Sequence, residues 1–216
     1  MIKIDRGNFA SNINFLKKAN ILEKKQRILE VGSGTGHLAR YLTDRGYHIV
    51  GTEINRQYID FAKERFGISL LEMKGENLQL KNKTFDVVLS FDVFEHIINT
   101  DEHLKEVRRV LKPHGYYLLS TPNKWTNIPF EIISKKSLFG YKKYHCSLHN
   151  YWQIKKRFNY NGFSIRFIDI LVANNFFKKK VKKNLGFLGL FLLKTINLDK
   201  LPLFLRTNFY IVAQKN

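Results

Sequence analysis

The sequence of 216 residues contains a single cysteine, Cys146. One thiol cannot form an intramolecular disulfide, and it excludes a metal site built from several cysteines. The sequence also has no apolar run of about 18 residues, the length that a membrane-spanning helix requires. The first residues, MIKIDRGNFASN, lack the apolar stretch of a signal peptide. We therefore expect a cytoplasmic protein.

Acidic residues are scarce in the last third of the sequence. Residues 1–131 contain 20 Lys and Arg and 16 Asp and Glu, whereas residues 132–216 contain 17 and 2. Such a basic segment attracts anionic partners: nucleic acid, an anionic membrane surface or a phosphorylated substrate. A compositional bias of the whole chain is the alternative explanation of the net charge of +19, but it explains the asymmetry less well.

Alternating strand-like and helix-like patterns run through the chain. Strands are predicted at RILEV, YHIVGTE, ISLLEMKG, TFDVVLSFD, GYYLLSTP, GFSIRFIDI and TNFYIVAQK. Helices are predicted over residues 9–24, after Gly34, over INRQYIDFAKERFG, NTDEHLKEVRRVLKPHG and LHNYWQIKKRFNYNG, and over residues 172–200. Strands and helices in this order predict an α/β fold, with a mainly parallel sheet covered on both faces. No linker interrupts it, so residues 1–216 form one predicted domain.

Four polar segments follow predicted strands of this sheet. They are the glycine loop at 32–36, Glu53, Asp92 and the STPN segment at 120–123. Ligands of open parallel sheets bind outside the carboxyl ends of the strands. The sequence therefore predicts one binding site at this edge.

Six segments carry a resemblance to a known family: LEVGSGTG at 29–36, the acid of GTEIN at 53, GENLQL at 75–80, FDVVLSFDVFEHI at 85–97, VLKPHGYYLLSTPN at 110–123 and NYNGFSIRF at 159–167. In order and spacing they resemble class I S-adenosylmethionine-dependent methyltransferases of the small-molecule group, over about residues 25–170. The resemblance implies a Rossmann-like, seven-stranded, mostly parallel sheet with helices on both faces and the last strand antiparallel. It implies a cofactor-binding core at 25–121, with substrate-side or lid segments at 122–148 and 172–200.

The glycine spacing separates this family from the nicotinamide-dinucleotide fold. That fold uses G-x-G-x-x-G, in which the helix N-terminus receives a pyrophosphate. Here the spacing is G-x-G-x-G, and His37 occupies the position of the third glycine. Glu30, just before the loop, is favourable near the ammonium and sulfonium charges of S-adenosylmethionine and would repel a pyrophosphate. The loop therefore favours the sulfonium cofactor.

The cofactor residues follow from strand ends and from the resemblance. A carboxylate at Glu53 can accept both ribose hydroxyls. The resemblance places the turn at 76–78 beside the adenine, and Phe91 and Asp92 at the methionine end. The predicted cofactor-binding residues are Glu30, Gly32, Ser33, Gly34, Gly36, Glu53, Ile54, Glu76, Asn77, Phe91 and Asp92. No metal site is predicted.

Methyl transfer from a sulfonium mainly requires alignment of donor and acceptor. A general base is needed only where the acceptor must lose a proton, as a hydroxyl does. The candidates are His96 and His145, with Asp92 and Glu95 as weaker ones. For each histidine, a structural or surface imidazole is the alternative. By resemblance, Asp86 matches the acid that the family carries in the fourth strand. A structural role is the alternative interpretation of this residue.

The acceptor is less defined than the donor. No N/D-P-P-Y/F tetrapeptide follows the fourth strand, which disfavours methylation of the amino groups of nucleic-acid bases. No Pro-Cys pair occurs, which disfavours methylation of pyrimidines at C5. We expect transfer to oxygen of a small-molecule, lipid-linked or saccharide acceptor. The basic cluster at 178–183 and the apolar segment after it are typical of an interfacial helix, so contact with the inner membrane surface is a further expectation. The alternatives are an RNA methyltransferase that uses the basic third, and a non-catalytic S-adenosylmethionine-binding subunit. The sequence does not give the oligomeric state.

Overall fold

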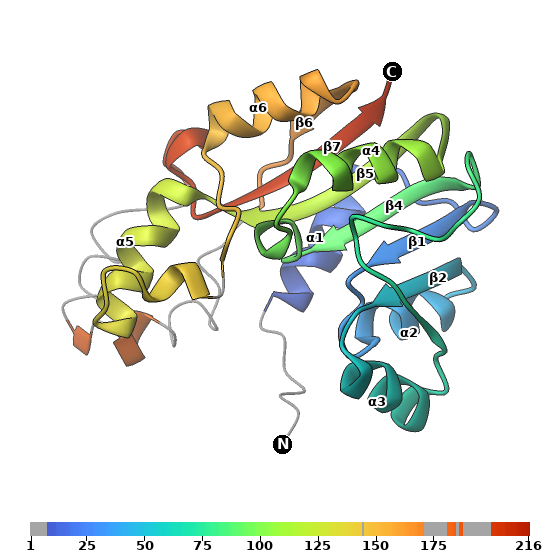
Figure 1. The fold of residues 1–216 in the computed structure, drawn as a ribbon, viewed down its shortest axis with the longest axis horizontal. Helices are drawn as coiled ribbons and strands as arrows, with labels where there is room; N and C mark the ends of the chain where they lie inside the picture. Colours follow the sequence, from blue (N-terminus) through green and yellow to red (C-terminus); the bar gives the residue numbers. More distant parts are fainter. Residues whose placement is uncertain (1–7, 144, 171–180, 185, 188–199) are drawn as a thin grey trace.

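A seven-stranded sheet forms the centre of the computed structural model, which describes residues 8–143, 145–170, 181–184, 186–187 and 200–216. The strands are β1 (Arg27–Val31), β2 (His48–Glu53), β3 (Leu70–Glu72), β4 (Phe85–Phe91), β5 (Leu111–Pro122), β6 (Phe163–Phe167) and β7 (Asn208–Lys215). Their order is β3-β2-β1-β4-β5-β7-β6 (Figure 1). β1 to β5 pair in parallel, and β7 pairs antiparallel with both β5 and β6. The predicted fold is confirmed, including the antiparallel last strand.

The described part of the chain contains six complete α-helices, in addition to the short helical stretches at 181–184 and 186–187. The six helices are α1 (Phe9–Ala19), α2 (His37–Thr43), α3 (Arg56–Phe66), α4 (Thr100–Val110), α5 (Lys124–Lys135) and α6 (Tyr151–Tyr160). Short 3-10 helices are η1 (Phe94–His96), η2 (Gly140–Lys143) and η4 (Leu203–Leu205). No helix among the described residues combines the length and apolar character that crossing a membrane requires.

Apolar residues of the strands alternate between two cores. Ile28 of β1 packs with Phe15 of α1 and Leu38 of α2, whereas the adjacent Leu29 packs with residues of α4 and α6, such as Leu104. Successive strand side chains point to opposite faces, so one strand supplies both cores. Helices therefore cover both faces of the sheet, as predicted (Figure 1).

Several helix ends follow the capping residues seen in the sequence. Asn99 accepts a hydrogen bond from the Glu102 N–H at the start of α4, and Gly67 ends α3 with a left-handed φ of 67°. The first predicted helix, over 9–24, is too long. It ends at Ala19 because Asn20 adopts a left-handed conformation with φ 52°.

The segment 122–148 holds α5 and η2, which contact each other. Its predicted partly helical character agrees with the described residues, whereas a lid or substrate-side role stays a prediction. Of the helix predicted over 172–200, residues 181–184 and 186–187 are helical. Residues 172–180, 185 and 188–199 of that prediction, which include residues 178–180 of the cluster at 178–183, lie outside the described residues.

Candidate active site

The glycine loop connects β1 to α2 at the carboxyl edge of the sheet. Gly32, Gly34 and Gly36 all have left-handed φ angles, of 71°, 54° and 77°. A Cβ added at Gly32 would lie 2.5 Å from Cγ2 of Val93, the residue after Asp92. The Ser33 N–H donates to the Thr52 carbonyl at 2.8 Å, which attaches the loop to β2. The loop thus lies directly between the ends of β2 and β4.

Glu53, at the end of β2, is buried and accepts three backbone hydrogen bonds. Its Oε2 accepts from the Gly34 N–H at 2.6 Å, and its Oε1 accepts from Ile54 and Asn55 at 2.9 and 3.0 Å. The glycine loop and the acid, which are separate signals in the sequence, are therefore in direct contact. A carboxylate offers about four acceptor positions, so ligation of two hydroxyls by Glu53 requires that the Gly34 N–H bond be shared or released.

A cavity of about 560 Å³ opens between these elements. The predicted residues that line it are Gly32, Glu53, Ile54, Glu76, Asp92 and His96. The lining residues that were not predicted as site residues are Val31, Tyr58, Met73, Lys74, Gly75, Val93, Ile97 and Ile98. Val31, Gly75, Val93 and Ile97 lie in the segments that carry the resemblance, whereas the other four lie outside them and only their spatial position identifies them.

The other predicted residues are not part of the cavity lining: Glu30, Ser33, Gly34, Gly36, Asn77, Phe91 and His145. Glu30 is buried, and the ring of Phe91 packs edge-on against Phe15 in the core at 6.0 Å. Asn77 is exposed. Gly34 acts on the site through its bond to Glu53. The family pattern thus marks residues that build the cavity wall as well as residues that face the cavity.

A buried polar chain supports the cavity wall at Gly75. His103 of α4 binds the Gly75 carbonyl through Nδ1 at 2.8 Å, and its Nε2 binds the hydroxyl of Tyr117 at 2.9 Å. Tyr117 continues the chain to Ser90 at 2.9 Å. Burial lowers the pKa of His103, which favours a neutral imidazole in a structural role.

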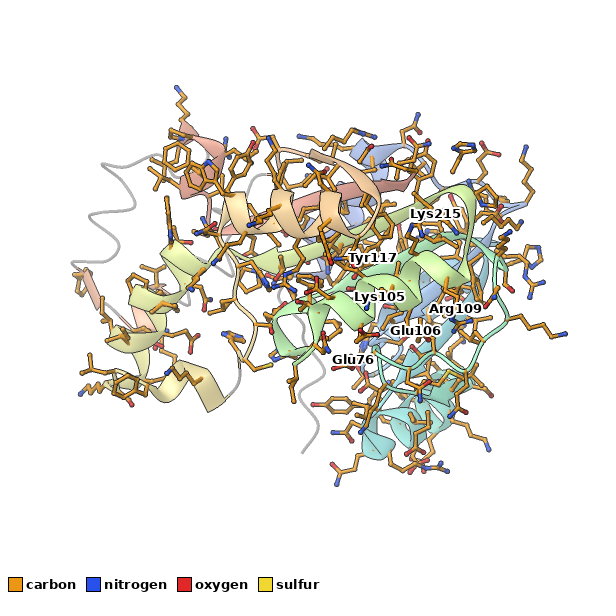
Figure 2. All side chains as sticks on the ribbon, turned by 45° about the horizontal axis from the view of Figure 1, so that its top comes forward. Glu76, Lys105, Glu106, Arg109, Tyr117 and Lys215 are labelled. Carbon is orange, nitrogen blue, oxygen red and sulfur yellow. The ribbon has the colours of Figure 1, made fainter. Side chains whose placement is uncertain are left out.

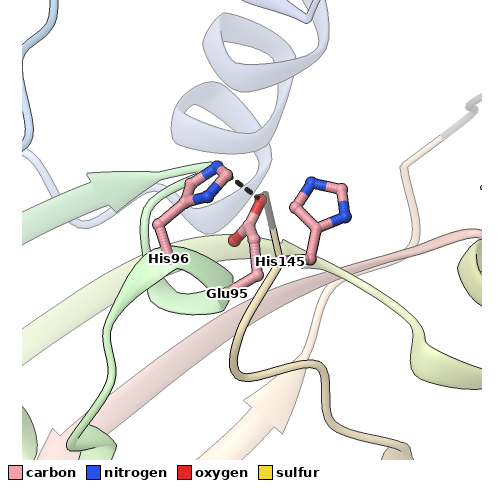
Figure 3. A group of neighbouring side chains, drawn as sticks. All are labelled: Glu95, His96 and His145. Atoms are coloured by element: carbon pink, nitrogen blue, oxygen red, sulfur yellow. Dashed lines mark ion pairs between the residues drawn. The ribbon is translucent and has the colours of Figure 1, made fainter. Parts of the chain in front are cut away.

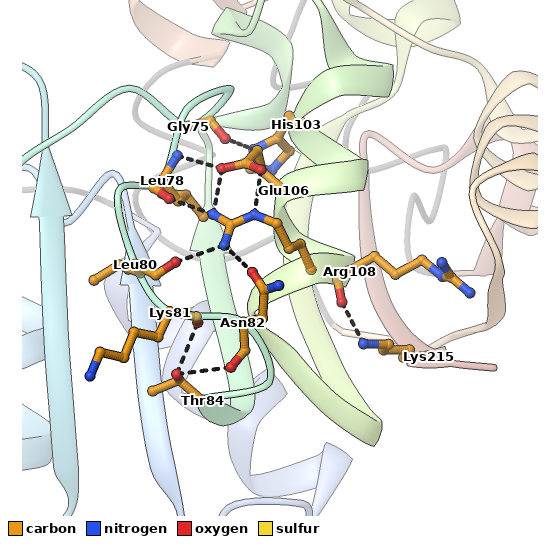
Figure 4. A network of polar contacts seen from close by, with 11 residues as sticks. Gly75, Leu78, Leu80, Lys81, Asn82, Thr84, His103, Glu106, Arg108 and Lys215 are labelled. Carbon is orange, nitrogen blue, oxygen red and sulfur yellow. Dashed lines mark hydrogen bonds and ion pairs between the residues drawn. The ribbon is translucent and has the colours of Figure 1, made fainter.

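A second network, on α4, holds the loop between β3 and β4 (Figure 4). Glu106 accepts from the Leu78 N–H, and the Arg109 guanidinium donates to the carbonyls of Leu78 and Leu80 and to Asn82. The ion pair with Arg109 lowers the pKa of Glu106. Glu106 and Arg109 lie next to each other on the helix, with Glu76 on the adjacent loop (Figure 2). The loop that carries Glu76 is thus fixed by charged side chains of α4.

Asp92 follows β4 and has a left-handed φ of 56°. Such a backbone conformation is rare outside glycine and is frequent at functional sites. Its Oδ2 accepts from Asn8 at 2.9 Å and its Oδ1 from Ser120 at 3.3 Å. These two bonds and the turn direct the Asp92 carboxylate to the cavity that it lines.

Glu95 in η1 is almost fully buried, with 2% of its surface exposed. Burial, together with the nearby Asp92 carboxylate, raises the pKa of Glu95 to about 8. Thr121, near the end of β5, donates to its Oε2 at 3.1 Å. Ionisation of Glu95 beside a second carboxylate is therefore unfavourable unless a cation is nearby.

Both histidines predicted as base candidates lie beside Glu95 (Figure 3). The rings of His96 and His145 are 5.2 Å apart, and His96 Nε2 lies 4.0 Å from Glu95 Oε1. His145 Nδ1 is 3.2 Å from Oδ1 of Asn127 in α5. The two histidines are distant in the sequence, and only the fold brings them together.

Asp86 lies at the opposite edge of the sheet. It accepts the Arg27 N–H at 2.8 Å and pairs with Lys112, at the start of β1 and β5. This arrangement is consistent with the structural alternative that the sequence left open for Asp86.

The chain is similar to known proteins over this region. Residues 29–119 match the family model of a methyltransferase domain. A fatty-acid O-methyltransferase of Mycolicibacterium smegmatis is 36% identical over 109 residues, covering 48% of this chain and 40% of that protein. A ubiquinone biosynthesis O-methyltransferase of Roseobacter denitrificans is 33% identical over 106 residues, covering 47% and 43%. The chain thus spans less than half the length of these curated relatives.

Solved structures share the fold over nearly the whole chain. A putative methyltransferase of Bacillus halodurans has a TM-score of 0.67 at 15% identity, covering 95% of this chain and 99% of that one. Phosphoethanolamine N-methyltransferase 2 of Haemonchus contortus, in complex with S-adenosyl-L-methionine, has a TM-score of 0.66 at 18% identity. It covers 99% of this chain and 54% of that one.

Proposed function

We propose that this chain is an S-adenosylmethionine-dependent methyltransferase that transfers a methyl group to oxygen of a small-molecule or lipid-linked acceptor. Residues 29–119 match the methyltransferase domain model, and the chain shares the class I fold of solved methyltransferases. The observation that carries the proposal is the convergence of the glycine loop, Glu53 and Asp92 on one cavity beside two histidines.

The charges of the cavity fit the donor. Three acids line it, Glu53, Glu76 and Asp92, against one base, Lys74. This balance favours a ligand with ammonium and sulfonium charges and disfavours a pyrophosphate. Gly32 lines the cavity, and a side chain there would collide with Val93, so this position requires glycine. The proposed cofactor is therefore S-adenosylmethionine, held by the predicted residues that line the cavity.

The acceptor is proposed from the relatives and from the surface near the site. Two relatives are named as O-methyltransferases, one of them for a fatty acid. Ile98 lines the cavity and is 84% exposed. Leu138 and Phe139, on the segment that precedes His145, are also exposed. An exposed apolar side chain at the cavity favours an acceptor with an apolar part.

The proposed mechanism relies on alignment and on one proton transfer. When bound, S-adenosylmethionine supplies an activated methyl group and leaves as S-adenosylhomocysteine. The cavity wall aligns the donor with the acceptor oxygen, which attacks the methyl carbon as the carbon–sulfur bond breaks. His96 or His145 takes the proton of an acceptor hydroxyl, because a neutral imidazole is a base near neutral pH.

Cofactor binding is tested with Gly34→Asp. A carboxylate at this position repels Glu53, which lies 2.6 Å from the Gly34 nitrogen, so we expect loss of S-adenosylmethionine binding by calorimetry. Gly67→Asp is the matched control. It also has a left-handed φ, of 67°, and nothing lies within 4 Å of an added Cβ. Unchanged cofactor affinity in Gly34→Asp would refute the proposed site.

The reaction is tested by acceptor-dependent formation of S-adenosylhomocysteine. The panel holds fatty acids, phenols, lipid-linked saccharides and RNA, each with the wild-type protein. Turnover on RNA alone would replace the proposed acceptor with the RNA alternative. Cofactor binding without turnover on any acceptor or cell extract would replace the enzyme with a binding subunit.

A further inference from the structure

Glu95, His96 and His145 form a cluster whose ligand atoms all lie within 4.8 Å of one another. We propose that this cluster is a binding site for a divalent transition-metal ion of the Zn²⁺ class, at the mouth of the cavity. Two imidazoles and one carboxylate are a ligand set of catalytic zinc sites, in which a fourth position stays open. The site in Figure 3 has this composition.

The carboxylate ligand is fixed by its surroundings. Thr121 donates to Glu95 Oε2 at 3.1 Å, while Oε1 lies 4.0 Å from His96 Nε2. One oxygen is thus held by the protein and the other is directed toward the histidines. Asp92 adds a second negative charge nearby. A cation at this point would offset the charge of Glu95, which burial makes costly to ionise, and that of the neighbouring Asp92.

The histidine ligands come from two segments that are hydrogen-bonded to each other. The Ser147 N–H donates to the Glu95 carbonyl at 3.0 Å, which holds the segment of His145 against η1. Asn127 Oδ1 lies 3.2 Å from His145 Nδ1. When Nδ1–H donates to this oxygen, the lone pair of the imidazole lies on Nε2. A hydrogen bond of this kind is how proteins fix the tautomer of metal-ligating histidines.

The separations are close to those of a bound ion. Ligand bonds of about 2.1 Å in a tetrahedral site place ligand atoms about 3.4 Å apart. The His96 side chain is 48% exposed, so its ring can rotate inward to close the remaining distance. Because His96 also lines the cavity, the open position of the ion faces the space proposed for the ligands.

A role of the ion in the reaction rests on the proposed function. A metal at this position would bind the acceptor oxygen and lower the pKa of its hydroxyl. It would replace a histidine as the group that promotes loss of the proton, because a metal-bound imidazole nitrogen has no lone pair for a proton. The two mechanisms therefore differ in their response to a chelator.

Metal binding is tested on the untagged protein by titration with Zn²⁺, Mn²⁺ and Mg²⁺ in competition with a chelating dye. We expect one Zn²⁺ per chain, and affinity lowered at least about tenfold by His96→Ala and by His145→Ala. Asn127→Ala keeps both histidines and should weaken binding by about tenfold. The control is His48→Ala, an exposed histidine at the start of β2, which should bind as the wild type.

The outcomes separate this inference from the proposed function. No binding of Zn²⁺ or Mn²⁺ by the wild type, or equal binding by His96→Ala and His145→Ala, would overturn the metal site. Binding of S-adenosylmethionine is measured in His145→Ala and Asn127→Ala, whose residues do not line the cavity, and it should be retained where the metal is lost. If Gly34→Asp leaves cofactor binding unchanged, the proposed cofactor site is refuted, whereas the metal site is not affected.

Discussion

Individual buried residues of this chain have properties that their sequence context does not give. His149 looks like an ordinary histidine before a helix, yet its ring is 7% exposed and packs on Phe94 at 5.4 Å. Burial, together with the positive charge of Arg157, lowers the pKa of His149 to about 4. In the folded protein this histidine is therefore neutral at a pH at which it is charged in the unfolded chain.

His149 should make the protein less stable in mild acid. The unfolded chain binds the proton near pH 6.5 and the folded protein only near 4. The unfolded state thus holds more protons in this window, and stability is lost as the pH falls from 6.5 toward 4, by about 3 kcal/mol. In His149→Gln, the decrease in the free energy of unfolding over this pH window, measured by urea unfolding, should be smaller by about that amount. His48→Gln should behave as the wild type, and an unchanged pH dependence in His149→Gln would contradict the burial argument.

Single elements were predictable where local chemistry decides them. Asn99 and the acids after it gave the correct start of α4, at Thr100. The helix predicted over NTDEHLKEVRRVLKPHG is too long, because α4 ends at Val110 and residues 111–115 belong to β5. β5 begins earlier than predicted, at Leu111, with a register shift opposite Phe85. Pro113 lies in this stretch, and a proline argues against a strand unless pairing with the neighbour is irregular. That irregularity depends on the adjacent strand and is not visible in local sequence.

The candidate site was predictable only in part for a similar reason. The strand ends gave Glu53 and Asp92, because parallel strands end at one edge. The contacts of His145 with His96 and of Gly34 with Glu53 join segments that are distant in the sequence. Local patterns contain no information on such pairs.

α4 determines how firmly the cavity loop is held. Lysine carries its three N–H donors on a single nitrogen, so Arg109→Lys cannot reproduce the planar guanidinium fork that spans Leu78, Leu80 and Asn82. We expect faster amide hydrogen exchange in residues 76–82 and S-adenosylmethionine affinity reduced by about three- to tenfold. Arg108→Lys, on the exposed side of the same helix, is the control. Equal amide hydrogen exchange of residues 76–82 in both variants would show that the loop keeps its conformation without the contacts of Arg109.

At the scale of the molecule, charge is distributed unevenly along the chain. The sheet core is nearly balanced, whereas residues 132–216 hold 17 basic and 2 acidic residues. A field of this kind attracts anionic surfaces and weakens with salt. Contact with an anionic membrane is a proposal on this basis, and its residues lie largely outside the described part of the chain.

Vesicle binding tests this proposal. The wild type should bind vesicles with anionic lipid at low salt and release them at high salt. Reversal to Glu of the five lysines at 178–183 should abolish binding. A matched control reverses five exposed lysines of the other part of the chain: Lys24, Lys25, Lys63, Lys81 and Lys83. Equal loss of vesicle binding in both variants would mean that the net charge of the protein alone determines binding. Absence of vesicle binding by the wild type would refute the proposed membrane contact.

The position of β7 has a consequence for the order in which the molecule assembles. β7 pairs with β5 on one side and with β6 on the other, although it follows both in the sequence. During synthesis β6 therefore has no place in the sheet until residues 208–215 have left the ribosome. Such long-range closure is slow compared with helix formation. The half of the sheet that carries the glycine loop can form early, while the β6 edge is completed only by the last inserted strand.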